Sequence, residues 1–403
     1  MDDDLPLGKR IAGFRKLRGW TQAGLARRLN RSTSWVTKIE RGERRVDSMS
    51  VLLELARALS VPVYQLTGHG DQYQKPDISD HGALQLRMVL DRSASLRPSG
   101  ERPRSGSFLV AEAASLRRVY NVSDRKFSAS VPLLADLIVE ARAASGHHDK
   151  AERRATQTAL ANLYRLASLD LRRRGDYGRA RLAIDRALLT AEEVGHEFLI
   201  ASMSATLTVQ LMMQGDPEDG IALASDTLDM LRRHGGVIND PISYSVLNGA
   251  LNLYAAQAAV RAGDTAEAET LLNIAAATAA ESGVDRERYC LIFGPTNVSI
   301  QKIGMYVDSQ RPHEAAREAA RVNVDQVGSV SRRCYHHLHL ARAYGMLGND
   351  DAVLDALTAA RSVAPEFVRH DPLAREQVRD LVRRRRSLDE RLRRLAKDMT
   401  VLD

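Results

Sequence analysis

Residues 20–42 read WTQAGLARRLNRSTSWVTKIERG. The stretch predicts two short helices joined by a tight turn. On the second helix Val36 and Ile39 supply an apolar face for docking, and the opposite face carries small polar and cationic side chains: Thr33, Ser34, Thr37 and Lys38. A helix can enter the major groove when its exposed face bears groups that hydrogen-bond base edges or touch thymine methyls. We therefore expect the second helix to contact DNA.

The charge of the chain is concentrated around this stretch. Residues 1–70 carry 13 Lys and Arg against 7 Asp and Glu, a net charge of +6, whereas the rest of the chain carries 45 against 44. A local excess of positive charge favours a polyanionic partner. Residues 5–66 alternate short amphipathic segments with polar turns and have room for five helices. We expect a DNA-binding domain over residues 1–67.

Residues 5–66 resemble the XRE family of helix-turn-helix repressors, of the Cro and C1 type, and residues 21–42 match its motif almost position for position. The resemblance implies that Gln22 contacts a phosphate or braces the recognition helix. It also implies that Thr33, Ser34 and Lys38 face bases. Arg15 and Glu40 match a buried ion pair that ties the first helix to the recognition helix.

Four arginines flank the second helix of the motif: Arg31, Arg41, Arg44 and Arg45. They are expected to contact DNA phosphates, and so to provide affinity without much base selectivity. Two positions are possible for the Trp35 side chain: it packs against the first motif helix, or it contacts sugar and phosphate at the edge of the DNA groove. The alternative for the arginines is a merely solvated face. The candidate DNA-binding residues are Gln22, Arg31, Ser32, Thr33, Ser34, Thr37, Lys38, Arg41, Arg44 and Arg45.

The remaining chain predicts an all-α protein with a second domain. Residues 68–106 are rich in Gly, Pro, Ser and Arg and are expected to form a linker, with a possible short helix over residues 83–90. Residues 107–403 are rich in Ala and Leu at helical spacing. No apolar run is long enough to span a membrane. The two cysteines lack metal or disulfide spacing, so a cytoplasmic protein is expected.

An internal repeat appears when turn positions in this second domain are aligned. We call these turn positions pivots. Each pivot is followed, five residues later, by a small or apolar residue, which lets paired helices approach closely. The alternative is a generic Ala-rich bundle. The pivots are Gly175, Gly215, Gly263, Gln310 and Gly348, and the residues that follow them are Ala180, Gly220, Ala268, Ala315 and Val353.

The repeats resemble tetratricopeptide arrays, and the whole layout resembles peptide-responsive regulators of the RRNPP kind. The resemblance implies a solenoid whose first helices line a concave groove. An Asn amide in that groove can bond both groups of a peptide backbone, and arginines can face a carboxylate. Alternatively, these side chains are solvated or cap helices. The candidate ligand-binding residues are Asn162, Arg165, Arg172, Met213, Gln257, Arg261, Asn297, Tyr335 and Arg342.

Other chemistry finds little support in the sequence. His336 and His339 share a helix face, but no Cys or acidic residue stands at ligand spacing beside them, so no metal site is expected. No phosphate loop, nucleophile elbow or carboxylate pair indicates an enzyme, and no cofactor is expected. The basic final helix, with arginines at positions 383–386, 391, 393 and 394, is expected to form a solvated cap, with DNA or dimer contacts as the alternative.

Together these patterns predict a transcriptional regulator that binds an inverted-repeat operator as a homodimer, because one recognition helix reads only a few base pairs. A signalling peptide, as in quorum sensing, or a small molecule would bind the helical repeats and control operator binding. Two alternatives stay open: a protein-interaction scaffold tethered to DNA, and a constitutive regulator without an effector. The sequence does not distinguish a repressor from an activator.

Overall fold

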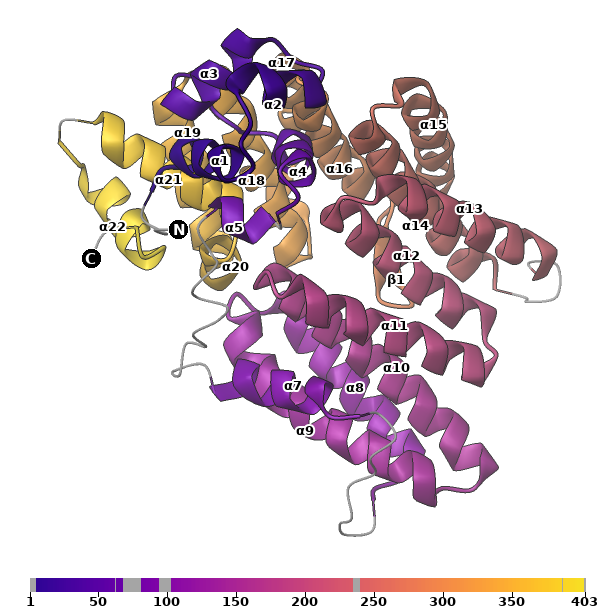
Figure 1. Cartoon of the computed structure of the whole chain (residues 1–403). Helices are drawn as coiled ribbons and strands as arrows, with labels where there is room; N and C mark the ends of the chain where they lie inside the picture. Colours follow the sequence, from indigo (N-terminus) through magenta and orange to yellow (C-terminus); the bar gives the residue numbers. More distant parts are fainter. Residues whose placement is uncertain are drawn as a thin grey trace. The chain divides into compact units, whose positions relative to one another are not determined.

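The computed structural model describes residues 5–61, 63–67, 81–93, 103–234, 240–385 and 387–401. These residues are almost entirely helical, as the sequence predicts (Figure 1). The exception is one short antiparallel hairpin, formed by β1 (Arg286–Arg288) and β2 (Leu291–Phe293). No described helix is both long and apolar enough to cross a membrane.

The chain divides into two compact units. Unit 1 comprises residues 1–75, 302–327 and 331–403, and unit 2 comprises residues 76–301 and 328–330. The N-terminal helices thus share a unit with the C-terminal quarter of the chain. The sequence had suggested instead that residues 107–403 form one sensor domain. The difference arises because polar side chains buried in the N-terminal domain find their partners after residue 302, as described below.

The N-terminal part of unit 1 contains the five expected helices. They are α1 (Leu7–Leu17), α2 (Gln22–Arg28), α3 (Thr33–Arg41), α4 (Met49–Ala58) and α5 (Val63–Thr67). The side chains of Thr21, Ser32 and Ser48 accept hydrogen bonds from backbone N–H groups of the helices that follow them, so each of these helices begins at a side-chain cap. Gly42 ends α3 with a left-handed backbone, φ 75°.

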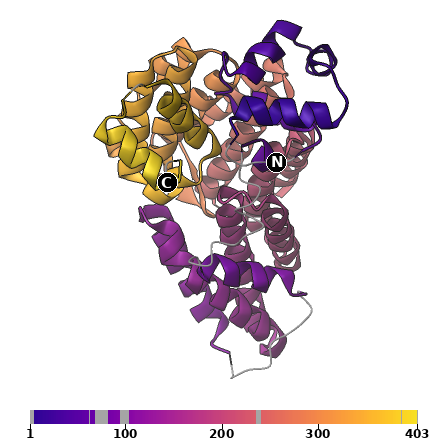
Figure 2. The same cartoon turned by 60° about the vertical axis from the view of Figure 1, so that its left-hand side comes forward.

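The C-terminal part of unit 1 consists of short helices. They are the end of α16 (Pro295–Asp308), α17 (Pro312–Ala319), the 3₁₀ turn η1 (Val324–Gln326), α18 (Val330–Met346), α19 (Asp350–Val363), α20 (Pro365–Arg369), α21 (Pro372–Arg384) and α22 (Glu390–Asp398). In both views the indigo N-terminal helices lie beside the orange and yellow helices of the same unit (Figure 1, Figure 2).

Unit 2 begins with α7 (His81–Asp91), which confirms the short helix expected within the linker. This helix is part of the fold of unit 2, because Arg142 donates to the carbonyl of Val89 and Arg186 to that of Leu90, both at 2.9 Å. Residues 68–80 and 94–102 of the supposed linker lie outside the described residues. The other helices are α8 (Gly106–Val122), α9 (Lys126–His147), α10 (Lys150–Arg173), α11 (Tyr177–Val194), α12 (Glu197–Gln214), α13 (Pro217–His234), α14 (Pro241–Ala262) and α15 (Thr265–Ser282).

All five predicted pivots lie in turns between paired helices, so the repeat is confirmed as a series of helical hairpins. The pairs are α10–α11, α12–α13, α14–α15, α16–α17 and α18–α19. Every pivot has a positive φ, and Gln310 adopts 60° without the freedom of a glycine. The small residues that follow the pivots are buried. Gly220 shows why they are small, since an added Cβ would lie 3.1 Å from the carbonyl oxygen of Thr208.

Candidate DNA-binding interface and repeat-domain site

The position of α3 is fixed by a buried ion pair. Arg15 donates through Nε to Glu40 Oε1 at 2.6 Å and through Nη2 to Oε2 at 2.9 Å, and its Nη1 donates to the carbonyl of Trp20. Burial alone would raise the pKa of Glu40, but hydrogen bonds from Arg15 and Gln22 outweigh it and hold the pKa below its ordinary value. The structure confirms the predicted pair, which ties α1 to α3.

Gln22 braces the recognition helix from α2. Its Nε2 donates to Glu40 Oε2 at 2.8 Å, and its Oε1 accepts from the hydroxyl of Thr37 at 2.9 Å. Thr37 lies equally close to the carbonyl of Thr33 in its own helix. Ser32 caps α3 by accepting from the backbone N–H of Trp35 at 3.1 Å. Gln22, Ser32 and Thr37, which were predicted to bind DNA, therefore have structural partners within the domain. Arg31 and Arg41 also form exposed ion pairs there, with Glu54 at 3.5 Å and Glu43 at 3.7 Å.

The outer face of α3 remains exposed. Thr33, Ser34, Lys38 and Arg41 are all exposed, as is Arg44 just after the helix. Trp35 is half-buried and its ring lies under the guanidinium of Arg31, 5.6 Å from ring centre to Cζ. This arrangement presents hydroxyl and ammonium groups on a rigid helix, which is what base-edge recognition requires.

Arg45 differs from the other flanking arginines. It is paired with Asp350 of α19 and donates to the carbonyl of Gly345 at 3.3 Å, so its side chain is largely buried. Arg45 nevertheless lines, with Arg31, Arg44 and Arg384, a hollow of about 990 Å³ beside α3. Arg384 belongs to the basic run at residues 383–386, for which a solvated cap was expected and DNA contact was the alternative. Only its place in a run of arginines pointed to it, since the chain separates it from the motif by more than 300 residues.

In unit 2 the predicted groove residues meet the β-hairpin. Arg165 of α10 is buried. It donates through Nη2 to the carbonyl of Cys290 at 2.8 Å and through Nε to the hydroxyl of Thr206 at 2.7 Å. Burial lowers the pKa of Arg165. The Oδ1 atom of Asn162 accepts from the Cys290 thiol at 3.4 Å. The hairpin therefore contacts two of the residues that were predicted to bind a peptide.

Asn297 is also committed to the hairpin. Its side chain is completely buried and donates to the carbonyl of Ile292 at 2.8 Å, while its backbone N–H donates to Asp285. Asn162 and Asn297, predicted as equivalent ligand-binding positions, thus hold the tip and the base of the same hairpin. This element was missed because strands of three residues are too short to show an alternating pattern.

The other predicted ligand-binding residues are distributed over both units. In unit 2, Arg261 donates to the sulfur of Met213 at 3.0 Å, and one nitrogen of each of Gln257 and Arg172 is buried without a hydrogen-bond partner among the described residues. In unit 1, Tyr335 stacks on His339, and Arg342 pairs with Asp371 at 3.2 Å. Arg342 is buried within unit 1, and Tyr335 is half-buried there.

The histidines of α18 are internal as well. His336 and His339 are both buried, and Nε2 of His336 lies 3.2 Å from the carbonyl of Ala319. Burial lowers the pKa of His336, which favours the neutral ring. Within the described residues, no group of three His, Cys, Asp or Glu side chains is arranged to hold a metal ion.

The geometry of α2 and α3 is that of a helix-turn-helix protein. The recognition helix α3 is capped at its start, held by α1 and α2 on its inner face, and exposed on its outer face. Residues 6–66 match the family model of a helix-turn-helix domain. The chain is 41% identical over 59 residues, 15% of its own length and 84% of the relative's, to an uncharacterized HTH-type transcriptional regulator, YazB, of Bacillus subtilis (strain 168). The chain belongs to the helix-turn-helix transcriptional regulators, and its N-terminal domain is a DNA-binding domain.

Among solved structures, the chain is similar to Bacillus thuringiensis PlcR, crystallised in complex with the peptide PapR7 and DNA. The match covers 86% of this chain and 98% of the other, with 14% identity and a TM-score of 0.34.

Proposed function

We propose that this chain is a ligand-controlled transcriptional regulator of the XRE type that binds an inverted-repeat operator as a homodimer in the cytoplasm. The observation that carries the DNA-binding part is the exposed outer face of α3, held rigid by the Arg15–Glu40–Gln22 network. Thr33, Ser34 and Lys38 would contact bases, and Arg31, Arg41 and Arg44 would contact phosphates.

Dimerisation is proposed because one recognition helix reads too few base pairs to specify an operator. Two such helices on half-sites about 34 Å apart would supply the missing specificity. Ligand control is proposed because the chain has, outside its helix-turn-helix domain, a second compact unit built of helical hairpins. A ligand acts on operator binding only through different affinities for two states of the protein.

The test is selection from randomised duplex DNA with the full-length protein, with and without extract of the producing cells. An inverted repeat whose affinity changes with the extract supports both the dimer and the diffusible effector. Recovery of a single half-site contradicts the dimer. An inverted repeat indifferent to the extract favours the scaffold or constitutive reading.

Lys38→Ala supplies a matched variant for this selection, with Arg57→Ala, an exposed change in α4, as its control. We expect Lys38→Ala to relax one base position in each half-site. If the base selectivity of the Lys38→Ala variant is unchanged, Lys38 does not contact bases.

A further inference from the structure

A cavity of about 310 Å³ lies in unit 2 beside the tip of the β-hairpin. Its wall is mostly apolar, with Val110, Ala113, Ala114, Leu166 and Leu199 contributed by α8, α10 and α12. Small-molecule sites begin at about this size and share this character, an apolar wall with a few polar groups. The polar groups here are Arg117, Thr158, Asn162, His196 and Tyr289.

The hairpin tip that closes this cavity has an unfavourable backbone. Strands β1 and β2 are joined by two residues only, Tyr289 and Cys290, and both have left-handed backbones, with φ of 46° and 63°. Turns of this kind favour Asn and Gly, because other side chains are strained there. The contacts of the tip with α10 and α12 must offset this strain.

Those contacts are aromatic and polar: the Tyr289 ring packs edge-on against Phe198, with ring centres 5.6 Å apart, and the remaining contacts are hydrogen bonds. Ser202 donates to the carbonyl of Tyr289 at 2.5 Å, Arg165 donates to that of Cys290, and the Tyr289 hydroxyl lies 3.3 Å from Nε2 of His196. A ligand in the cavity would touch Tyr289 and Cys290 directly, since both line it. An occupant of the cavity would therefore act on the hairpin tip directly.

One residue links the cavity to the body of the hairpin. Arg117 of α8 lines the cavity and forms an ion pair with Glu287 of β1, which also accepts from Asn121 at 3.3 Å. Both members of the pair are partly exposed, so exchanging one carboxylate for another at Arg117 costs little. An incoming carboxylate would compete with Glu287 for the same guanidinium.

We propose that this cavity binds a small carboxylate with an apolar body, whose carboxylate takes Arg117 from Glu287 and loosens the hairpin. The inference rests on the proposed ligand control and names its ligand class. An extended peptide fits less well, because the hairpin already bonds Asn162 and Arg165. A compact ligand needs only the space beside the tip.

The test measures binding of hexanoate, octanoate and decanoate to the full-length protein by titration calorimetry, with the corresponding primary alcohols as neutral probes. At least one acid should bind saturably and at least tenfold more tightly than its alcohol. Arg117→Gln should abolish this preference, and the neighbouring exposed change Arg118→Gln should leave it intact.

Two further variants guard against loss of folding. Ala114→Phe should fill the cavity and abolish binding, with Ala111→Phe on the exposed side of α8 as its control. Glu287→Gln removes the competing carboxylate, so acid affinity should rise several-fold, a gain that misfolding cannot produce. Equal binding of acids and alcohols, or no binding by any acid, would overturn the proposal.

Operator affinity, measured in the same samples, shows whether a failure lies in the proposed cavity or in the proposed ligand control. If acids bind as expected and operator affinity does not change, the cavity is a ligand site but ligand control through it fails. If cell extract changes operator affinity equally in wild type, Ala114→Phe and Arg117→Gln, ligand control stands and this cavity is not its site.

Discussion

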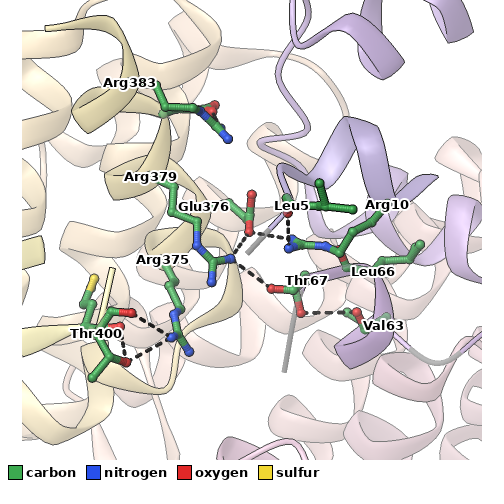
Figure 3. A network of polar contacts seen from close by, with 12 residues as sticks. Leu5, Arg10, Val63, Leu66, Thr67, Arg375, Glu376, Arg379, Arg383 and Thr400 are labelled. Carbon is green, nitrogen blue, oxygen red and sulfur yellow. Dashed lines mark hydrogen bonds and ion pairs between the residues drawn. The ribbon is translucent and has the colours of Figure 1, made fainter. Parts of the chain in front are cut away.

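The Nη2 atom of Arg10 donates to Oε1 of Glu376 at 2.8 Å, although the two residues are 366 positions apart in the chain (Figure 3). Both side chains are almost fully buried. Arg10 also donates to the carbonyls of Leu5 and Leu66, and Arg379 bonds both Glu376 and the carbonyl of Thr67. This network joins α1 and α5 of the DNA-binding domain to α21.

Removing the charge of Glu376 should destabilise unit 1. Glu376→Gln keeps the shape but leaves Arg10 buried without its carboxylate, so we expect the free energy of unfolding to fall by about 3 kcal/mol. Urea denaturation measures the change. Glu390→Gln, which alters an exposed pair on α22, should cost under about 1 kcal/mol. Equal effects of the two variants would show that the buried pair contributes nothing.

Asp47 should make stability depend on pH. Burial raises its pKa to about 6, although the charge of Arg45 opposes the rise. Between about pH 4 and pH 6 the folded state therefore holds a proton that the unfolded state has lost, and stability decreases as pH rises through this window. Asp47→Asn should abolish this decrease and raise the free energy of unfolding at pH 7.5 by on the order of 2 kcal/mol.

Thermal and urea unfolding between pH 4 and pH 8 measure this effect. The amide that Asp47→Asn introduces can donate to Gln377, whose Oε1 is buried without a partner among the described residues. Asp351→Asn, at a site 85% exposed, is the control and should leave the profile unchanged. A profile of Asp47→Asn parallel to wild type would mean that Asp47 is not the titrating group.

Gly249 should tolerate no side chain. A Cβ there would lie 2.1 Å from the ring of Phe293, which anchors the hairpin base on α14. Gly249→Ala should therefore destabilise unit 2 by about 1–3 kcal/mol, against the helix propensity that favours alanine. Gly178→Ala in α11, where nothing lies within 4 Å of the added atom, should be neutral or stabilising by calorimetry. A stable Gly249→Ala variant would mean that Phe293 has room to move.

Substitutions of Arg44 and Arg45 should have different effects, because only Arg44 is expected to contact a DNA phosphate. Arg44 is exposed, so Arg44→Gln should weaken operator binding and reduce the slope of log affinity against log salt by about 0.9, the loss of one phosphate contact. Arg45→Gln should leave the slope nearly unchanged, because Arg45 pairs with Asp350, and should lower stability instead. Fluorescence anisotropy across salt concentrations checks both, and equal slope changes would place both arginines on phosphate.

The sequence predicted those parts of the fold that depend on local patterns. All five pivots follow from residues that recur at a fixed offset, and the Arg15–Glu40 pair follows from the resemblance of residues 5–66 to the XRE family. The Gln310 pivot was found by its spacing even though it lacks the usual glycine.

Other features depend on distant residues, and no local pattern predicts them. The pairing of Arg10 with Glu376 and of Arg45 with Asp350 divides the chain in a way that the linker composition did not suggest. The hairpin that bonds Asn162 and Asn297 has strands too short to show alternation, so a groove was expected where the chain places its own residues.

The start of α4 has one more consequence. Asp308, from the end of α16, accepts a hydrogen bond from the backbone N–H of Met49 at 3.2 Å and lies 3.3 Å from the hydroxyl of Ser48. Residues 1–67 grafted onto another regulator would lose this acceptor together with Glu376 and Asp350. The DNA-binding domain is thus not structurally independent. Chimeras that exchange operator specificity should include residues 302–403 together with this domain.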